Sequence, residues 1–240
     1  EDNQKALAAG LQILEAECTT QILADGGHAS RNPEALAEAL LDIQAVEELL
    51  LRLGLVAPAF LTRLQPRMAA MLSFFQLPDS GILAAHGGGD AANGVASAAL
   101  RPHGGVSSKF AFARLSAWQR IQAEELTVYV DAGEGPPRPH GGRAHASALA
   151  ITVDDGPDRM VTSCGANPDL EPALKDAARR TAAHSVLSLN GEDSAVFTPD
   201  PVTGLRAPEG PAQLSIRRLE EGDQYLLEGL QPWQPQLRLL

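Results

Sequence analysis

The chain of 240 residues carries 30 Asp and Glu against 19 Lys and Arg, which gives a formal net charge of −11. A surface this acidic repels phosphate backbones, so nucleic acid is not expected as the main partner. Apolar residues make up 44% of the chain, enough for a core. No run reaches the roughly 18 apolar residues that a membrane span needs, so no span is expected. The two cysteines, Cys18 and Cys164, cannot form a disulfide framework and are either unpaired or joined in one bridge.

The first third of the chain predicts three helices. Leucines recur at three- and four-residue spacing over residues 2–23, which is typical of an amphipathic helix. A second helix is expected over 33–53, with Asn32 as its N-cap and proline at its first position. A third is expected over 58–75, with a kink at Pro66. Short loops between them favour stacked helical hairpins, as in a bundle or an α/α toroid.

The composition changes after residue 78. Residues 79–107 are rich in Gly, Ala, Ser and His without periodicity, which indicates a long surface loop or linker. Short runs bounded by turn residues then predict strands at Glu125–Asp131, Ala148–Val153, Met160–Ser163, Val186–Leu189, Gln213–Leu219 and Gln224–Leu230. Glu171–Ala183 is expected to be an inserted helix, and Asn190-Gly191 a two-residue turn. The pattern predicts an α+β protein, with a helical part over 1–78, a linker over 79–111 and a β domain over 112–240.

The loop between the first two predicted helices holds the first group of candidate functional residues. His28, Arg31 and Asn32 lie where a helix begins, and backbone N–H groups and the helix dipole favour an anion there. The alternative is that Asn32 caps the helix and that the other two side chains are simply solvated. Spacing alone leaves both interpretations open.

Two further groups lie in the β part. Arg143 and His145 are two residues apart, so in an extended segment they share a face. His184 ends the run RRTAAH, where a helix is expected to give way to a strand. Each of these histidines taken alone is more typical of a surface or packing position.

Taken in order, these segments resemble the heparinase II/III family of polysaccharide lyases. The loop QILADGGHASRNP resembles the toroid loop that presents active-site polar residues. GGRAHASALAITVDDG resembles the family segment H-A-H-A-D-A-L, which opens the β-sandwich. MVTSCGANP and RRTAAHSVLSLNGEDS resemble its glycine-bearing strand and its T-A-A-H signature. The resemblance implies a longer parent protein, of which this chain would hold the last helices of an α/α toroid and the first part of an antiparallel β-sandwich.

The resemblance implies β-elimination at an acidic sugar, which needs a group that neutralises the uronate carboxylate, a base and an acid. By resemblance, His28 and His145 are the candidate catalytic residues, and Arg31, Asn32 and Arg143 would bind the substrate. No cofactor is implied for catalysis. A structural zinc is implied by relatives in which the counterparts of His145 and His184 are ligands alongside a carboxylate. Cys164 is a candidate third ligand, although Ser163 and Cys164 face opposite ways along a strand.

This sequence departs from the family pattern at three places. The stretch SFFQLPDSGILAAHGGG lacks the tyrosine that family lyases use as acid, and His86 falls near its expected position. Ser163 stands where the zinc carboxylate is expected. Arg143 replaces the first histidine of H-A-H, which exchanges a group that titrates near neutrality for a permanent cation.

Three hypotheses follow from the sequence. The chain is part of a lyase that cleaves a uronic-acid glycan, a relative that binds such a glycan without cleaving it, or a structural relative in which a His145/His184 metal clip supports the toroid. The expected partner is an acidic polysaccharide. The expected location is the cell envelope or periplasm, where family members that degrade polysaccharides usually work.

Overall fold

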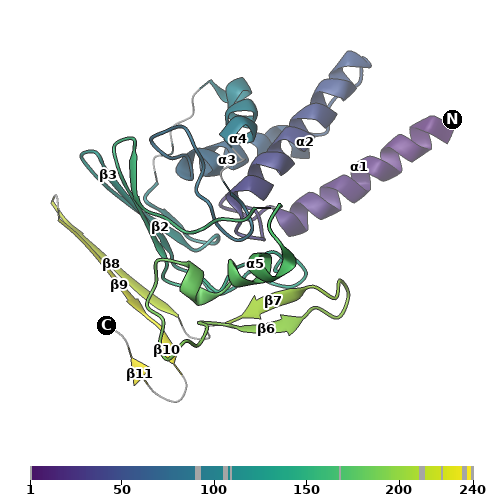
Figure 1. Ribbon diagram of the computed structural model, residues 1–240. Coiled ribbons are helices and arrows are strands. Elements are labelled where there is room, and N and C mark those ends of the chain that lie inside the picture. The colour runs from purple at the N-terminus through teal and green to yellow at the C-terminus, as the bar shows by residue number, and fades with distance from the viewer. Residues whose placement is uncertain are drawn as a thin grey trace.

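The computed structural model describes residues 2–89, 93–104, 108, 110–167, 169–210, 214–222, 224–233 and 237–238. Helices form the N-terminal part and antiparallel strands most of the rest (Figure 1). The predicted α+β class is confirmed. None of the helices in these ranges is long and apolar enough to cross a membrane.

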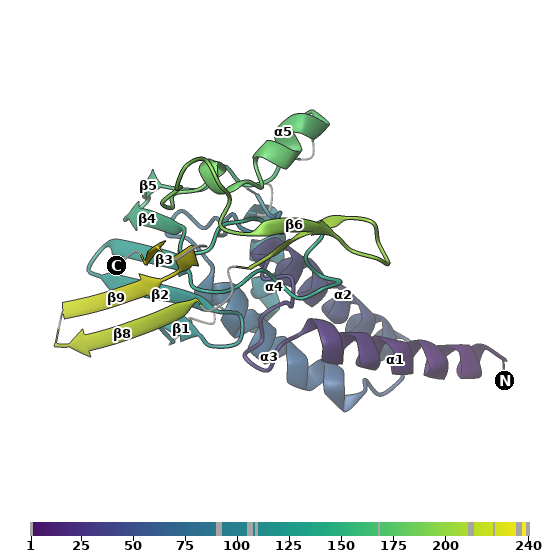
Figure 2. The same cartoon turned by 90° about the horizontal axis from the view of Figure 1, so that it is seen from below.

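The three predicted helices are present as α1 (Asp2–Gln21), α2 (Pro33–Arg52) and α3 (Ala59–Phe74). Pro66 lies inside α3. Helix α2 packs on α3 and on a fourth helix, α4 (Asn93–Leu100). Helix α1 projects from the body of the molecule and is largely exposed, with only Cys18 buried (Figure 2).

The expectation of a surface linker over residues 79–111 is wrong for most of its described part. Residues 81–89 are almost entirely buried, and His86 is only 2% exposed. Helix α4 follows within the same stretch. The segment is rich in small side chains, which is why its composition resembled that of a loop. The same small side chains allow its backbone to pass between the helices and the strands.

The main sheet contains five antiparallel strands in chain order. They are β1 (Phe112–Ala113), β2 (Trp118–Ala123), β3 (Leu126–Asp131), β4 (Ile151–Asp155) and β5 (Asp158–Val161). Three of them overlap runs that the sequence predicted, whereas β1 and β2 were not anticipated.

Three hairpins complete the β part. They are β6 (Val196–Pro199) with β7 (Arg206–Glu209), β8 (Ser215–Glu221) with β9 (Gln224–Leu230), and β10 (Pro232–Trp233) with β11 (Leu237–Arg238). The β8–β9 hairpin was predicted. It lies against the main sheet, where Arg218 donates to the Gln119 side chain at 3.1 Å and to the Arg120 carbonyl at 3.0 Å.

Two predicted elements differ from the structure. Residues 186–189 form no strand, and Leu189 instead makes a single bridge to Glu192 around Asn190-Gly191, both of which have positive φ. The turn itself is therefore confirmed. The helix expected over 171–183 is divided into α5 (Pro172–Ala177) and a 3₁₀ turn at Thr181–Ala183.

Helices and sheet share one hydrophobic core. The ring of Phe74 at the end of α3 lies 5.9 Å from that of Tyr129 on β3, and Phe75 lies 5.8 Å from Trp118 on β2. The Tyr129 hydroxyl lies 3.0 Å from the Phe74 carbonyl oxygen and 3.1 Å from that of Gln76. The two parts of the chain thus fold against each other and are not independent domains in their packing.

Candidate active-site region and anion groove

Arg31 reaches from the loop before α2 into the interior between helices and strands. Its Nε donates to the Ser116 carbonyl at 2.9 Å, and its terminal nitrogens donate to the carbonyls of Glu134 at 2.6 Å and Ala117 at 3.0 Å. It also forms an ion pair with Asp131. The side chain is only 6% exposed. Arg31 therefore joins the two parts of the fold, and the predicted role of binding a solvent anion is not compatible with this geometry.

Asp131, at the end of β3, is the centre of a buried polar cluster that the sequence did not reveal. Besides Arg31, its carboxylate lies 3.1 Å from His86 Nε2 and accepts a hydrogen bond from Ser147 Oγ at 2.7 Å. Burial by itself raises the pKa of Asp131, but Arg31, His86 and Ser147 together hold it well below its usual value. The carboxylate therefore stays ionised and balances the charge of Arg31.

Three histidines extend this cluster toward the C-terminal strands. The backbone N–H of His145 donates to His86 Nδ1 at 3.3 Å, and the His145 and His184 rings stack with centroids 4.9 Å apart. His184 Nδ1 lies 3.1 Å from Ser163 Oγ. Burial lowers the pKa of all three imidazoles, so they are neutral near pH 7.

The space inside this cluster is too small for a sugar. The cavity bordered by Asp131, His145, Ser163 and His184 has a volume of only about 10 Å³. Such a space holds at most one water molecule. His145, a predicted catalytic residue, and His86, which falls near the expected position of the family tyrosine, are only 3% and 2% exposed.

The run Gly87–Gly89 explains how the cluster is brought together. A Cβ on Gly87, whose φ is +92°, would lie 2.7 Å from the Cβ of Arg143, and one on Gly88 would lie 2.5 Å from Asn32 Oδ1. These close approaches exclude any larger side chain. Arg143 Nη2 also donates to the Gly87 carbonyl at 2.8 Å, which ties the segment before β4 to this loop.

His28 and Asn32 have local structural roles. Asn32 caps α2, because its Oδ1 accepts hydrogen bonds from the backbone N–H groups of Glu34 and Ala35. His28 Nδ1 lies 2.7 Å from Ser30 Oγ, and its ring packs edge-on to His140 at 6.1 Å. Burial and the neighbouring His140 lower the pKa of His28 to about 4. The capping interpretation of Asn32 is therefore the one observed.

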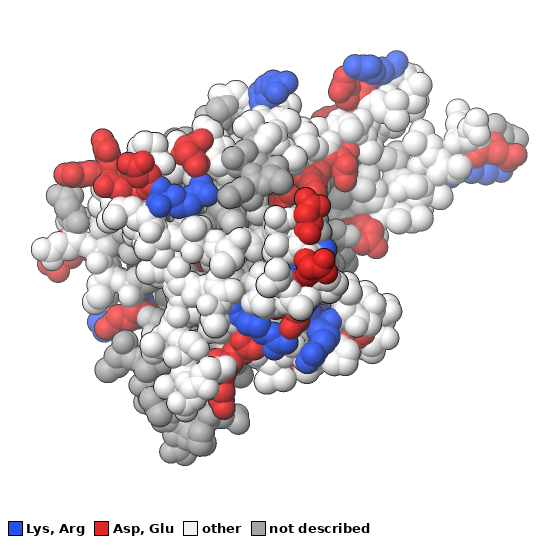
Figure 3. All heavy atoms as spheres, in the orientation of Figure 1, with Lys and Arg blue, Asp and Glu red and all other residues white. Residues whose placement is uncertain are grey.

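A groove of about 310 Å³ opens beside the histidine cluster, and we call it the Arg143 groove. Its cationic side chains are Arg143, Lys175 on α5 and Arg179, and His145 forms part of its wall. No Asp or Glu is among its described lining residues. Arg179 is held in place by a hydrogen bond from Nε to the Ala144 carbonyl at 2.9 Å and by the Phe197 ring at 5.0 Å. Figure 3 shows basic side chains over the β6–β7 hairpin, with acidic side chains next to them.

The residues present do not fit the implied zinc site. A structural zinc needs four ligands, usually cysteine and histidine with an occasional carboxylate. His145 Nδ1 and His184 Nε2 are buried and lack hydrogen-bond partners within the described residues, but the third position is Ser163 and Cys164 is exposed. Over the described ranges, no group of three or more His, Cys, Asp or Glu is arranged to hold a metal ion.

The two tyrosines of the chain do not replace the missing acid. Tyr129 is buried between helices and sheet, where burial raises its pKa to about 12. Tyr225 lies on the β9 strand of the outer hairpin. Sequence reasoning missed Asp131 and Lys175 as members of these two sites, and it gave no role to Arg179 although that residue begins the run RRTAAH. For Asp131 a usable signal was a carboxylate directly ending an apolar strand and followed by AGEG.

Substituting Asp131 tests whether the buried ion pair joins the fold. Asp131→Asn leaves the Arg31 charge buried without a counter-charge, so the free energy of unfolding should fall by about 3–5 kcal/mol. Urea unfolding measures this change. Glu48→Gln, which breaks the exposed pair with Arg52, is the control and should cost less than about 0.5 kcal/mol. Equal, small losses in both variants would contradict the assignment.

The depressed histidine pKa values predict loss of stability in mild acid. Below about pH 6.5 the unfolded chain takes up protons that half-buried His28 and buried His86 resist, so the free energy of unfolding falls as the pH falls. In His28→Gln the difference between unfolding free energies at pH 7 and pH 5 should shrink by about 1–2 kcal/mol. His103→Gln, on the 3₁₀ turn after α4, is the control for loss of a histidine elsewhere. An unaltered difference in His28→Gln would refute the prediction.

Restoring the carboxylate tests the metal-site interpretation. Wild-type protein should contain no stoichiometric zinc by elemental analysis, and EDTA should leave its melting temperature unchanged. Ser163→Asp adds a carboxylate beside His184 and should gain zinc together with a higher melting temperature. The neighbouring variant Thr162→Asp serves as the control. One zinc per wild-type chain would show that the missing ligands are supplied in another way.

Comparisons with known proteins agree with this architecture. Residues 106–235 match the family described as heparinase II/III-like, C-terminal. FtsZ-localized protein C of Caulobacter vibrioides (strain NA1000 / CB15N) is 29% identical over 220 residues, covering 89% of this chain and 37% of that protein.

Solved structures show the same fold at low sequence identity. The heparan sulfate lyase HepC from Pedobacter heparinus matches with a TM-score of 0.68 and 16% identity, over 99% of this chain and 39% of that chain. A heparinase III structure matches with a TM-score of 0.67 and 13% identity, over 96% and 40%. The chain thus spans about two fifths of the length of these proteins. Because the family match covers more than half of this chain, the chain belongs to the heparinase II/III-like family.

Proposed function

We propose that this member of the family binds a uronic-acid-containing glycan in the Arg143 groove and does not cleave it. The observation that carries the proposal is the contrast between a closed histidine cluster and an open cationic groove next to it. The whole protein, of which relatives have more than twice this length, is the unit to which the proposal applies.

The absence of cleavage is supported by the groups that β-elimination would need. His86, which falls near the expected position of the family tyrosine, is buried against Asp131. His145 has its backbone N–H bonded to His86 and its ring stacked on His184. Neither imidazole can reach a sugar proton without opening this packing, and Arg143 cannot serve as a base at neutral pH.

Binding of an anionic glycan is supported by the charge of the groove. The chain has a net charge of −11, yet Arg143, Lys175 and Arg179 meet in the groove without a lining carboxylate. Guanidinium groups pair with carboxylates through two parallel hydrogen bonds, which suits a uronate. The volume of about 310 Å³ is at the lower end of the range for small-ligand sites and fits one or two sugar rings.

The relatives support the same proposal from two directions. The structural neighbour HepC is titled a heparan sulfate lyase, which favours an acidic polysaccharide as the partner class. The curated relative at 29% identity is named for its localisation with FtsZ and not for an enzymatic activity, which favours loss of catalysis. An acidic polysaccharide partner also favours the cell envelope as the location.

Glycan binding is tested with the full-length protein and its Arg143→Gln variant. Heparin- and alginate-derived tetrasaccharides should bind with an affinity that falls as salt rises, whereas a neutral cellotetraose should not bind. Arg143→Gln should weaken binding about tenfold or more, since charge-assisted hydrogen bonds contribute about 1.5–3 kcal/mol. The exposed Arg63→Gln on α3 is the matched control. Calorimetric titration that finds no difference between the two variants would contradict the assignment.

The same preparations distinguish binding from cleavage. Incubation with heparin, alginate and bacterial uronate polymers should produce no unsaturated sugar absorbing in the near ultraviolet. Product formation would restore the lyase hypothesis. Failure of all glycans to bind would instead favour a purely structural role for this part of the protein.

A further inference from the structure

We propose that a second cavity, between α3, α4 and strands β2 and β3, binds a small anionic sugar of one or two rings. We call it the α4 cavity. It is distinct from the Arg143 groove, because the two share no lining residue, and it does not depend on the proposed function.

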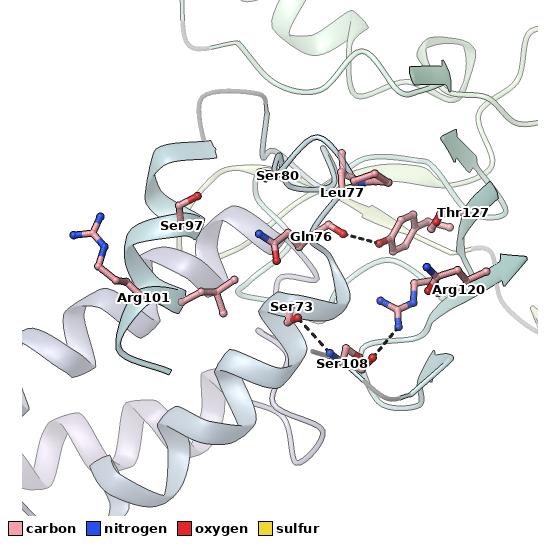
Figure 4. A pocket seen from close by; sticks show the side chains of 13 residues that line it. Ser73, Gln76, Leu77, Ser80, Ser97, Arg101, Ser108, Arg120 and Thr127 are labelled. Atoms are coloured by element: carbon pink, nitrogen blue, oxygen red, sulfur yellow. Dashed lines mark hydrogen bonds between the residues drawn. The ribbon is translucent and has the colours of Figure 1, made fainter. Parts of the chain in front are cut away.

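The α4 cavity has a volume of about 670 Å³. Figure 4 shows its lining side chains, which come from the end of α3 and the following loop, from α4, and from the two strands. Tyr129 is among the lining residues, and its hydroxyl donates to the Gln76 carbonyl at 3.1 Å. The volume exceeds that of one sugar ring and lies within the usual range for ligand sites.

Neutral hydrogen-bonding side chains dominate the lining. Within the described part of the chain, six of them make no side-chain hydrogen bond, namely Gln76, Ser80, Ser97, Ser108, Gln122 and Thr127. The hydroxyl of Ser108 is moreover buried, and a buried hydroxyl without a partner costs free energy. Several uncommitted hydroxyl and amide groups in one cavity match the alternating donors and acceptors of a sugar. Leu77, Pro78 and Leu100 supply apolar surface for its C–H faces.

The charged groups favour an anionic sugar over a neutral one. Arg101 and Arg120 line the cavity, and no Asp or Glu is among its described lining residues. Arg120 is fixed by hydrogen bonds to the carbonyls of Phe74 at 3.3 Å and Ser108 at 3.2 Å, and its guanidinium lies over the Phe74 ring at 4.9 Å. Arg101 is exposed at the edge of the cavity and is free of ion pairs to the described residues. Two arginines, with no carboxylate among the described lining residues, favour a carboxylate or a phosphate on the ligand.

The test uses D-glucuronate and glucose 6-phosphate as probes, with glucose as the neutral comparison. All titrations are made in the full-length protein carrying Arg143→Gln, which weakens any binding in the Arg143 groove, and loss of binding in Ser97→Trp assigns the remaining signal to the α4 cavity. Ser97→Trp fills the cavity from an exposed position of α4, and Thr20→Trp on exposed α1 is its control. Arg101→Gln removes the exposed cation, and Arg114→Gln, at another exposed position, is its control.

At least one of the two anions should bind saturably and about tenfold more tightly than glucose. Ser97→Trp should abolish this binding and Arg101→Gln should weaken it about tenfold, whereas the two control variants should bind like the parent. Binding of the phosphate alone or the carboxylate alone supports the proposal and identifies the acid group. Equal binding of glucose, loss in both tryptophan variants, or no binding of either anion overturns it. None of these outcomes depends on whether the Arg143 groove binds glycans.

Discussion

The fold depends on one buried ion pair, between Arg31 of the helical part and Asp131 of the sheet. The Arg31 side chain donates from the loop before α2 to three carbonyls of the strand region. Asp131 in turn contacts His86 and accepts a hydrogen bond from Ser147. Two charges removed from water are stable only when each is paired and fully hydrogen-bonded. The loop, the glycine-rich segment and the end of β3 must therefore adopt one mutual arrangement, and this requirement fixes how helices and sheet meet.

The same constraint separates two kinds of polar residue that look alike in the sequence. The histidines of the buried cluster around Asp131 are neutral and shielded from solvent, and they contribute packing and hydrogen bonds. Cations outside it, at Arg143, Lys175 and Arg179, line open space. In this fold the three histidines are therefore enclosed, whereas the cations of the Arg143 groove line open space.

Local patterns predicted the helices, the β8–β9 hairpin and the Asn190-Gly191 turn, because spacing, caps and turn residues act over a few positions. The sequence also singled out Arg31, His145 and His184, which the structure does bring together. It could not show that they are enclosed, since enclosure depends on Asp131 and His86, which lie 100 and 55 residues from Arg31. The glycine-rich run was misjudged for the same reason. Small side chains are typical both of an exposed loop and of a backbone packed between two layers. Which of the two forms depends on neighbours that are distant in the sequence.

The hydrogen bond from Arg143 to the Gly87 carbonyl has a thermodynamic consequence. Gly87 directly follows His86, so the Arg143 guanidinium that lines the groove also holds the backbone next to the buried cluster around Asp131. A ligand that draws the guanidinium away must compete with this anchor, and occupancy of the groove is then linked to the local opening of the segment around His86. By linkage, conditions that favour local opening around His86 change the apparent affinity of the groove for its ligand. A bound ligand in turn changes the amide hydrogen exchange of residues around His86 that it does not contact.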